Sequence, residues 1–537
     1  MMKFSALFIF LFYSSIFYAQ ETVMYRLILT DKGVSEYSID EPEKFLSQKS
    51  IDRRMRQGFS IDETDLPISP TYFDALIEAG ASIQTYSKWV KTVVVTLDDE
   101  ESPDIVKNLP FVAECYPVFR GLATYSREKE RKGEKEEYPV FTPENGDFDD
   151  YGDAWTQISL SNGHLLHNRG FKGNDITIAV LDGGFRGANA ANYFDHSKIL
   201  GVKNFTHQNE NLFYSSIDHG TKVLSCMLTN NPSEMIGTAP EASYYLFKTE
   251  VNGSEFPVEE DYWIAAVEYA DSLGVDIVST SLGYFTFDDP NMNHVQMQLD
   301  GETVPISRAA SMAAYKGMIL CNSAGNERVS DWRKIIFPAD AKNILTVGAI
   351  AGDSSLAYFS SVGYTSDERV KPDIMAMGLD VTVIGAYGKE KSNGTSFSCP
   401  IISGLTASLW QALPSFNSLK LMDLIRKSAD RYQNPDGEYG YGIPDYFKAY
   451  TEGLFESLIP SKLISDHLVF DSKESRIYVR GGNDSQTRLS IYTSMGIKVL
   501  DTRMVSDYLD VSYLNKGIYI VCFQNGNKQY TGKFVIR

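Results

Sequence analysis

The stretch Ser392-Asn393-Gly394-Thr395-Ser396-Phe397-Ser398-Cys399-Pro400 leads directly into an apolar run from Ile401 to Leu413. Glycine, hydroxyl side chains and proline before such a run predict the start of a buried helix. Backbone N–H groups converge at a helix start, and the helix dipole favours developing negative charge there. Ser396 in this place can be an ordinary helix cap, with Pro400 in the first turn, or a nucleophile, and the stretch alone does not decide between them.

The segment around this helix, residues 151–455, alternates apolar strands with helices. This pattern is typical of a mainly parallel sheet covered by helices on both faces, so we predict a doubly wound α/β domain. The predicted strands are Ile176 to Leu181, Val275 to Ser279 and Met318 to Asn322, and the predicted helices are Tyr262 to Leu273 and Ile306 to Lys316.

Polar side chains follow the strands of this domain, and functional groups of open parallel sheets gather at the carboxyl ends of strands. Asp182 ends the first strand, and His219 opens an apolar helix. With Ser396 they offer an orienting acid, a base and a nucleophile in the chain order Asp, His, Ser. The amide of Asn326 follows another strand and could stabilise an oxyanion. The alternatives are a structural aspartate, a surface histidine and a strand-to-loop turn.

These four stretches resemble the signature blocks of the subtilisin-like serine peptidases, the subtilases. Gly394 to Pro400 resembles the nucleophile block of that family, Ile178 to Asp182 its acid block, and His219-Gly220-Thr221 its base block. Five further matches follow in the order of the family: Gly237 to Pro240, Ser281-Leu282-Gly283, Phe337-Pro338-Ala339, Lys371 to Ile374 and Tyr439 to Gly442.

The resemblance implies a serine endopeptidase that cleaves proteins and peptides and needs no cofactor for its chemistry. Asp182, His219 and Ser396 would form its triad, and Asn326 would stand in its oxyanion hole.

The resemblance also implies where a substrate would bind. Its backbone would pair beside Ser281, Leu282 and Gly283 as an added strand. Ile336 matches a position at the base of the main specificity pocket, where a branched apolar residue shortens the pocket. We therefore expect P1 side chains of medium size and apolar character.

The chain begins with three segments of different character. Residues 1–20 carry one early lysine and an apolar run, which predicts a secretory signal peptide. Residues 21–120 form a small, ferredoxin-like α+β domain, with strands predicted at Met24 to Thr30, Trp89 to Leu97 and Phe111 to Val118 and helices predicted after Ser69-Pro70 and Ser102-Pro103. Residues 121–150 form a charged linker. The resemblance implies that the domain is a propeptide that inhibits the enzyme, with cleavage in the linker.

Residues 463–537 return to short strands separated by turn signals, which predicts a small β-sandwich module. Its stretches Ile491 to Leu500, Leu509 to Leu514 and Asn515 to Val521 resemble the C-terminal sorting domains that type IX secretion machinery reads. This resemblance implies a secreted or cell-surface protein that passes through the periplasm of a Gram-negative bacterium.

Bulk composition excludes some partners. The formal net charge of −20 argues against nucleic acid as a main partner, because the phosphates of nucleic acid bind to positively charged protein surfaces. The five cysteines are scattered and do not form the close pairs of a zinc ribbon or a disulfide scaffold. We expect a monomer with mostly buried thiols.

Metal ligands are not evident in the sequence. The long loop from Tyr284 to Val304 carries the carboxylates Asp288, Asp289, Asp300 and Glu302. Structural calcium is one interpretation, and a solvated acidic loop is the preferred one because no EF-hand spacing is present. His164 and His167 have the spacing of a metal pair on a helix, but without a third ligand we predict a surface helix.

Two rival functions follow from the same residues. A catalytically silent subtilase fold used for binding would have lost Asp182, His219, Ser396 or Asn326, and all four are present. An α/β-hydrolase esterase needs Gly-x-Ser-x-Gly, and Ser396 lacks the trailing glycine.

Overall fold

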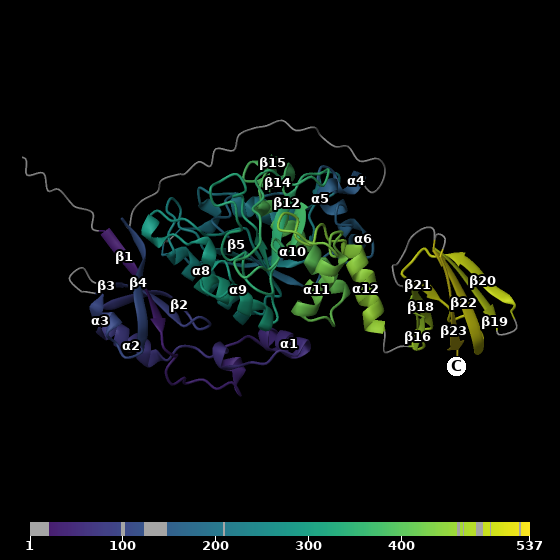
Figure 1. Cartoon of the computed structure of the whole chain (residues 1–537), viewed down its shortest axis with the longest axis horizontal. Helices are drawn as coiled ribbons and strands as arrows, with labels where there is room; N and C mark the ends of the chain where they lie inside the picture. The colour runs from purple at the N-terminus through teal and green to yellow at the C-terminus, as the bar shows by residue number, and fades with distance from the viewer. Residues whose placement is uncertain are drawn as a thin grey trace, which may run out of the picture.

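The computed structural model describes residues 21–97, 103–122, 148–207, 210–458, 462–465, 467–479, 487–493, 496–525 and 528–536. The predicted signal peptide and most of the predicted linker lie outside these ranges. Figure 1 shows an N-terminal domain, a large central domain and a C-terminal module in chain order. Within the described ranges, every helix is too short or too polar to span a bilayer.

The N-terminal domain, residues 21–122, is a four-stranded sheet with strand order β2-β3-β1-β4, in which β1 pairs antiparallel with β3 and β4. α2 begins at Pro70 directly after Ser69, as the sequence predicts. Its elements are β1 Glu21–Leu29, η1 Pro42–Lys44, α1 Gln48–Gln57, η2 Glu63–Asp65, α2 Pro70–Glu78, β2 Ala81–Ser87, β3 Thr92–Leu97, α3 Asp104–Lys107 and β4 Val112–Leu122.

Two details of this domain differ from the sequence-based expectation. β2 was not expected, because Ala-Ser-Ile-Gln-Thr-Tyr-Ser has few apolar residues to mark a buried face. β3 begins at Thr92 rather than Trp89, because Lys91 has a positive φ of 56° and turns the chain.

The central domain is built on a seven-stranded sheet of order β13-β12-β11-β10-β5-β9-β6. Every pair in it is parallel, which confirms the predicted doubly wound α/β fold. Thr280 of β10 lies opposite Leu181 of β5 and Asn322 of β11, so the residues that follow these three strands emerge at one edge of the sheet. The strands are β5 Thr177–Asp182, β6 Ile199–Asn204, β9 Ser243–Lys248, β10 Ile277–Thr280, β11 Ile319–Ser323, β12 Leu345–Ile350 and β13 Ile374–Met377.

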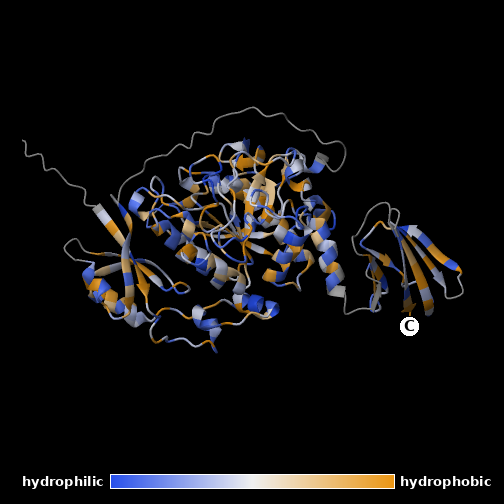
Figure 2. Ribbon diagram, viewed as in Figure 1, coloured by the Kyte–Doolittle hydropathy of each residue, from blue (hydrophilic) through white to orange (hydrophobic). Residues whose placement is uncertain are grey.

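Helices cover both faces of this sheet. Alternate side chains of β5 point to opposite sides: Ile178 and Val180 join the core that contains α10, and Ala179 and Leu181 join the core that contains α8. Figure 2 shows hydrophobic residues along the central strands between these layers. The helices are α4 Phe148–Tyr151, α5 Trp155–Ser159, α6 Gly163–His167, α7 His219–Leu228, α8 Val258–Leu273, α9 Pro305–Tyr315, α10 Thr395–Ala412, α11 Ser418–Ser428 and α12 Tyr446–Leu458.

Short elements complete the central domain. A hairpin of β14 and β15 precedes α10, and β7 pairs with β8. Their bounds and those of the short helices are η3 His196–Lys198, η4 Leu212–Tyr214, β7 Asn230–Asn231, β8 Met235–Ile236, η5 Pro290–Met292, η6 Gln296–Gln298, β14 Val381–Gly385 and β15 Gly388–Ser392.

The C-terminal module, the described residues from 462 onward, contains two four-stranded sheets, β16-β17-β18-β21 and β20-β19-β22-β23, around one apolar core. This agrees with the predicted β-sandwich. Asp507 accepts hydrogen bonds from Arg169 Nε at 2.6 Å and from the Tyr450 hydroxyl at 3.0 Å, both of the central domain. The strands are β16 Lys462–Ser465, β17 Leu468–Asp471, β18 Arg476–Val479, β19 Arg488–Thr493, β20 Lys498–Arg503, β21 Tyr508–Asp510, β22 Gly517–Asn525 and β23 Lys528–Ile536.

Candidate active site

Asp182 and His219 meet at the carboxyl edge of the central sheet. Nδ1 of His219 lies 3.0 and 2.9 Å from the two carboxylate oxygens of Asp182, and the Gly183 N–H donates to Oδ1 at 2.8 Å. Asp182 is fully buried, whereas the side chain of His219 is 36% exposed. A carboxylate bonded to Nδ1 favours the tautomer with its proton on Nδ1, which leaves Nε2 free to accept a proton.

Glycine allows this close approach. A Cβ on Gly220, which follows His219, would lie 2.9 Å from the Asp182 Cβ and 2.6 Å from the Gly184 carbonyl oxygen. Side chains do not approach that closely, so only glycine lets the first turn of α7 pack against the end of β5.

Ser396 is the second residue of α10, and Gly394 precedes the helix with a φ of 147°. The Ser396 hydroxyl donates to the carbonyl oxygen of Ser281 at 3.4 Å. The neighbouring Phe397 ring lies 5.7 Å from the His219 ring, between their centroids. Ser396 therefore lies at the same edge as His219, with its hydroxyl turned in this structure toward Ser281.

Pro400 lies inside α10, at its sixth residue, and not in the first turn as the sequence suggested. Proline has no N–H, so the carbonyl oxygen of Ser396, four residues earlier, receives no helical hydrogen bond from it. The Ser281 hydroxyl donates to that oxygen at 2.7 Å instead. The proline thus allows the residue after β10 to attach to the start of α10.

Asn326 lies beside the start of α10. Its Oδ1 accepts hydrogen bonds from the Thr395 N–H at 2.9 Å and the Thr395 hydroxyl at 3.0 Å. An N–H can only donate, so these bonds fix the orientation of the amide and leave Nδ2 on the other side. A Cβ on Gly394 would lie 3.7 Å from Nδ2. The Nδ2 donor is therefore next to the backbone that leads to Ser396.

The predicted substrate strand, Ser281 to Gly283, directly follows β10. The Asn322 amide donates to the Leu282 carbonyl at 3.4 Å. A Cβ on Gly283 would lie 2.4 Å from Cδ1 of Ile336, and one on Gly325 would lie 3.0 Å from the same atom. The Ile336 side chain thus lies between these two glycines, where the resemblance expects the base of the specificity pocket.

The four acidic side chains of the long loop are engaged within or near the loop. Asp288 accepts from the Glu255 N–H, and Asp289 forms an ion pair with Arg120 at 3.8 Å. Asp300 accepts from the N–H groups of Glu302 and Thr303, and Glu302 pairs with Lys342 at 2.6 Å.

Among the described residues, one group of three acidic side chains is close enough together to hold a metal ion, and it is not in this loop. It consists of Glu250, Glu255 and Glu259, with one oxygen of each within 4.8 Å of the others. Both oxygens of Glu259 accept backbone N–H groups, from Val251 at 2.6 Å and Phe256 at 3.0 Å. Burial and the neighbouring glutamates raise the pKa of Glu259 well above its ordinary value. The described contacts of Glu259 are thus backbone hydrogen bonds that hold the segment before α8.

His167 is buried, so the prediction of a surface helix was wrong for this residue. Its Nε2 lies 3.1 Å from the Thr238 carbonyl oxygen, which requires a proton on Nε2, and its Nδ1 lies 3.0 Å from the Tyr151 hydroxyl. Burial lowers the pKa of His167 to about 4. Both ring nitrogens serve internal hydrogen bonds rather than a metal.

Buried arginines join the N-terminal domain to the central domain, and sequence reasoning missed them. Nε of Arg26 on β1 lies 2.9 Å from both oxygens of Asp261 in α8, and Nη2 lies 2.7 Å from Oδ2. Arg53 and Arg54 of α1 both bind Asp271, near the other end of α8. In Figure 2, α1 is strongly hydrophilic. Its polar composition gave no apolar face from which docking could be predicted.

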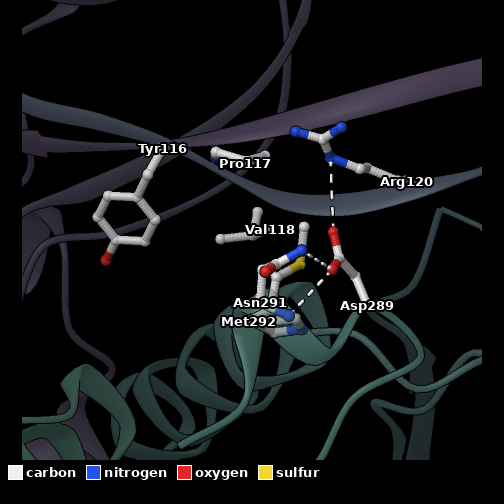
Figure 3. A pocket seen from close by; sticks show the side chains of 8 residues that line it. Tyr116, Pro117, Val118, Arg120, Asp289, Asn291 and Met292 are labelled. Carbon is white, nitrogen blue, oxygen red and sulfur yellow. Dashed lines mark hydrogen bonds and ion pairs between the residues drawn. The ribbon is translucent and has the colours of Figure 1, made fainter.

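A cavity of about 500 Å³ lies where β4 meets the loop of η5. Figure 3 shows Arg120 of β4 above Asp289, with Asn291 and Met292 beside it. The cavity is lined by Tyr116, Pro117, Val118, Arg120, Pro257, Asp289, Asn291 and Met292. It therefore belongs to the interface between the two domains and contains none of the predicted catalytic or substrate-binding residues.

Family models match three segments of the chain. Residues 173–442, about half of the chain, match the model of the subtilase family. The chain belongs to the subtilase family. Residues 24–136 match the S8 peptidase propeptide domain of Bacteroidota, and residues 473–537 match a secretion system C-terminal sorting domain. This subtilase is thus a subtilisin-like serine protease with a propeptide and a sorting domain.

Curated relatives include subtilisins. Subtilisin NAT of Bacillus subtilis subsp. natto and subtilisin E of Bacillus subtilis (strain 168) are each 26% identical over 375 residues, covering 69% of this chain and 83% of the relative. Among solved structures, MycP1 from Mycobacterium smegmatis is 19% identical over 58% of this chain and 87% of its own, with a TM-score of 0.44. The protease domain of PatA is 22% identical over 53% of this chain and 98% of its own length, with a TM-score of 0.42.

Proposed function

We propose that this subtilase is a serine endopeptidase in which Ser396 attacks the peptide carbonyl. His219 accepts the serine proton on Nε2 and passes it to the leaving amine, while Asp182 holds the imidazole in the required tautomer. The Asn326 Nδ2 and the Ser396 N–H stabilise the tetrahedral oxyanion. The observation that carries the proposal is the hydrogen bond of His219 to buried Asp182 at the sheet edge where α10 presents Ser396.

Substrate binding follows from the same edge. The substrate backbone adds as a strand beside Ser281, Leu282 and Gly283, and its P1 side chain meets Ile336. A branched aliphatic side chain between two glycines leaves room for medium apolar P1 side chains. A solvated acidic loop stays the preferred prediction and structural calcium its alternative. The loop carboxylates accept backbone N–H groups or pair with cations.

The propeptide acts as an inhibitor until the linker is cut. Its strand β1 binds the first turn of α8 through Arg26, and α1 binds the far end of α8 through Arg53 and Arg54. A signal peptide directs the chain to the periplasm of a Gram-negative bacterium. Type IX secretion machinery then reads the sorting domain and delivers a monomeric protease to the surface or the medium.

Casein hydrolysis by the purified secreted protein tests this function. The wild type hydrolyses casein, and Ser396→Ala reduces the rate to background with an unchanged circular dichroism spectrum. Casein hydrolysis that survives in Ser396→Ala would overturn the proposal. Hydrolysis of small esters without peptide cleavage indicates an esterase, and a folded wild type that hydrolyses neither indicates a silent fold used for binding.

A further inference from the structure

Residues 42–66 of the propeptide, which we call the arm, contain η1, α1 and η2. Lys32 closes the base of the arm, because its Nζ donates to the Leu66 carbonyl at 2.8 Å. Among the described residues, the apolar core of the N-terminal domain is formed by β1 to β4, α2, α3 and the residues beside them, and it includes no residue of the arm. Figure 1 shows α1 apart from the four-stranded sheet of its own domain. The arm therefore does not depend on the core of that domain.

Two arginines of α1 bind one carboxylate of the central domain. Nη2 of Arg54 lies 2.6 Å from Oδ2 of Asp271, and Nη2 of Arg53 donates to Oδ1 of the same side chain. Nη1 of Arg53 donates to the Val275 carbonyl. Both arginines and Asp271 are buried. The two guanidinium partners of Asp271 thus come from the arm.

Gln57, also in α1, joins two segments of the central domain that are far apart in the chain. Its Nε2 donates to the Gly317 carbonyl at 2.7 Å, and the Ser418 N–H donates to its Oε1 at 2.8 Å. Gly317 precedes β11, and Ser418 is the first residue of α11. A side-chain amide that both donates to and accepts from backbone groups requires a matched surface.

Lys316 of the central domain binds the other end of the arm. Its Nζ lies 3.0 Å from Oδ2 of Asp65 and 3.2 Å from Oδ1 of Asp62. The same oxygen of Asp65 accepts from Nη1 of Arg54 at 2.7 Å. Lys316, Asp65 and Arg54 are buried, and a buried charge without a partner is costly. The charges of the arm and of the surface beneath it are therefore complementary.

This surface lies at the amino edge of the central sheet. Val275 is two residues before β10, and Gly317 is two residues before β11. Asp182 is the last residue of β5, so the candidate active site lies at the opposite edge. The arm can thus bind without contacting a substrate or the triad.

We propose that the amino-edge surface is a second docking site of the propeptide, which the arm fills independently of the sheet domain that Arg26 anchors. Two linked sites hold a ligand more tightly than either site alone, because the second binding event is intramolecular. The arm keeps the propeptide on the protease domain after the linker is cut, and inhibition ends only when both sites open. This inference rests on the proposed inhibitory role of the propeptide.

The test is the rate at which the cut propeptide leaves the rest of the chain. The full chain carries Ser396→Ala, which prevents self-digestion, and a recognition sequence for an unrelated protease within residues 121–150. After cleavage at that sequence, size-exclusion chromatography at successive times measures the fraction of propeptide still bound. Arg53→Met together with Arg54→Met makes release faster by about 100-fold or more.

Arg56→Met is the matched control on the same helix. Arg56 is exposed, and its ion pair with Asp276 is 3.7 Å long. We expect its release rate to change by less than about threefold. Release from the double arginine variant at the rate of the parent chain overturns the inference.

Hydrogen exchange of the uncut chain tests the independence of the two sites. With Arg53→Met and Arg54→Met together, exchange becomes faster in α1 and at the Ser418 N–H, which Gln57 otherwise protects, and stays unchanged in β1. An increase in β1 equal to that in α1 overturns the inference, because the propeptide would then dock as one unit.

Gln57→Ala decides if the double arginine variant does not fold. Release that is faster by about tenfold supports the inference, because two hydrogen bonds to the central domain are lost, and an unchanged rate overturns it. Failure of the proposed inhibition is distinguishable, because release is measured on an inactive chain. A wild type that hydrolyses casein equally fast before and after the propeptide leaves would refute inhibition and not the second docking site.

Discussion

Arg26 on the first strand of the propeptide binds both carboxylate oxygens of Asp261 in the first turn of α8, with Nη2 at 2.7 Å and Nε at 2.9 Å. Both residues are buried, at 2% and 3% exposure. Breaking a buried ion pair by removing one partner is costly, because the remaining charge stays in a poorly solvated place. The pair is therefore a main contributor to the docking of the propeptide.

Arg26→Met in a Ser396→Ala background loosens the propeptide from the protease domain. We expect the propeptide to lose about 3–5 kcal/mol of docking free energy. Hydrogen exchange at β1 and at the start of α8 then becomes faster by about 100-fold or more. The matched control is Arg120→Ala, since Arg120 is half-exposed and forms only a long ion pair of 3.8 Å with Asp289. For Arg120→Ala we expect hydrogen exchange at the same sites to increase by less than about fivefold. Equal exchange in both variants would contradict this role of Arg26.

Asn326→Ala lowers kcat by about 10²- to 10³-fold with little change in KM, because an oxyanion donor acts mainly in the transition state. Asn326 also holds Thr395, so Thr395→Val is the control: it removes the hydroxyl bond of 3.0 Å and keeps the donor. For Thr395→Val we expect kcat to fall by less than about tenfold. Steady-state kinetics with one peptide substrate measures kcat and KM of the two variants. An equal loss of kcat in both would argue for a structural role of Asn326.

Ile336→Ala broadens the P1 preference toward large aromatic side chains. Removing the atoms that lie between Gly283 and Gly325 deepens the space, and kcat/KM for a P1 phenylalanine rises by about tenfold relative to P1 valine. Profiling with a peptide library measures this, and basic P1 residues stay poor in both enzymes. An unchanged profile, or a wild type that prefers basic P1 residues, would contradict the placement of Ile336 at the base of the specificity pocket.

His167 makes the protein sensitive to acid. Its folded-state pKa of about 4 lies below the unfolded value near 6.5, so the unfolded state binds the proton first. The stability that neutral His167 contributes is complete above about pH 6.5 and is lost as the pH falls toward 4, by about 3 kcal/mol.

Urea denaturation at pH 7 and pH 4.5 measures this contribution. His167→Gln, which cannot titrate, shows a smaller difference between its two urea midpoints than the wild type. His196→Gln changes an exposed histidine of η3 and keeps the wild-type difference. A His167→Gln difference as large as that of the wild type would refute the assignment.

Local patterns in the sequence were enough to predict the α/β architecture of the central domain. The apolar strands such as Ile176 to Leu181 and the amphipathic helices between them predicted the parallel sheet, because burial on both faces leaves a strong compositional signal. β2 escaped prediction because its polar residues carry no such signal. Pro400 was placed too near the helix start, because the sequence does not reveal that Ser281 replaces its missing hydrogen bond.

The site was predictable where motifs carry it and not where tertiary contacts build it. The blocks around Asp182, His219 and Ser396 pointed to their places at the sheet edge. The docking arginines had no sequence signal, because each depends on a partner far away in the chain, such as Asp261 for Arg26. Charged residues are expected at the surface, so only the folded structure identifies those that are buried.

The central claim is that Ser396 is the nucleophile of an active peptidase. The most direct measurement is labelling of the secreted enzyme with a fluorophosphonate, followed by intact-mass analysis and peptide mapping. We predict one adduct per chain, located on Ser396, with loss of casein hydrolysis in proportion to labelling. An enzyme that hydrolyses casein but stays unlabelled, or that carries its adduct on another residue, would contradict the account.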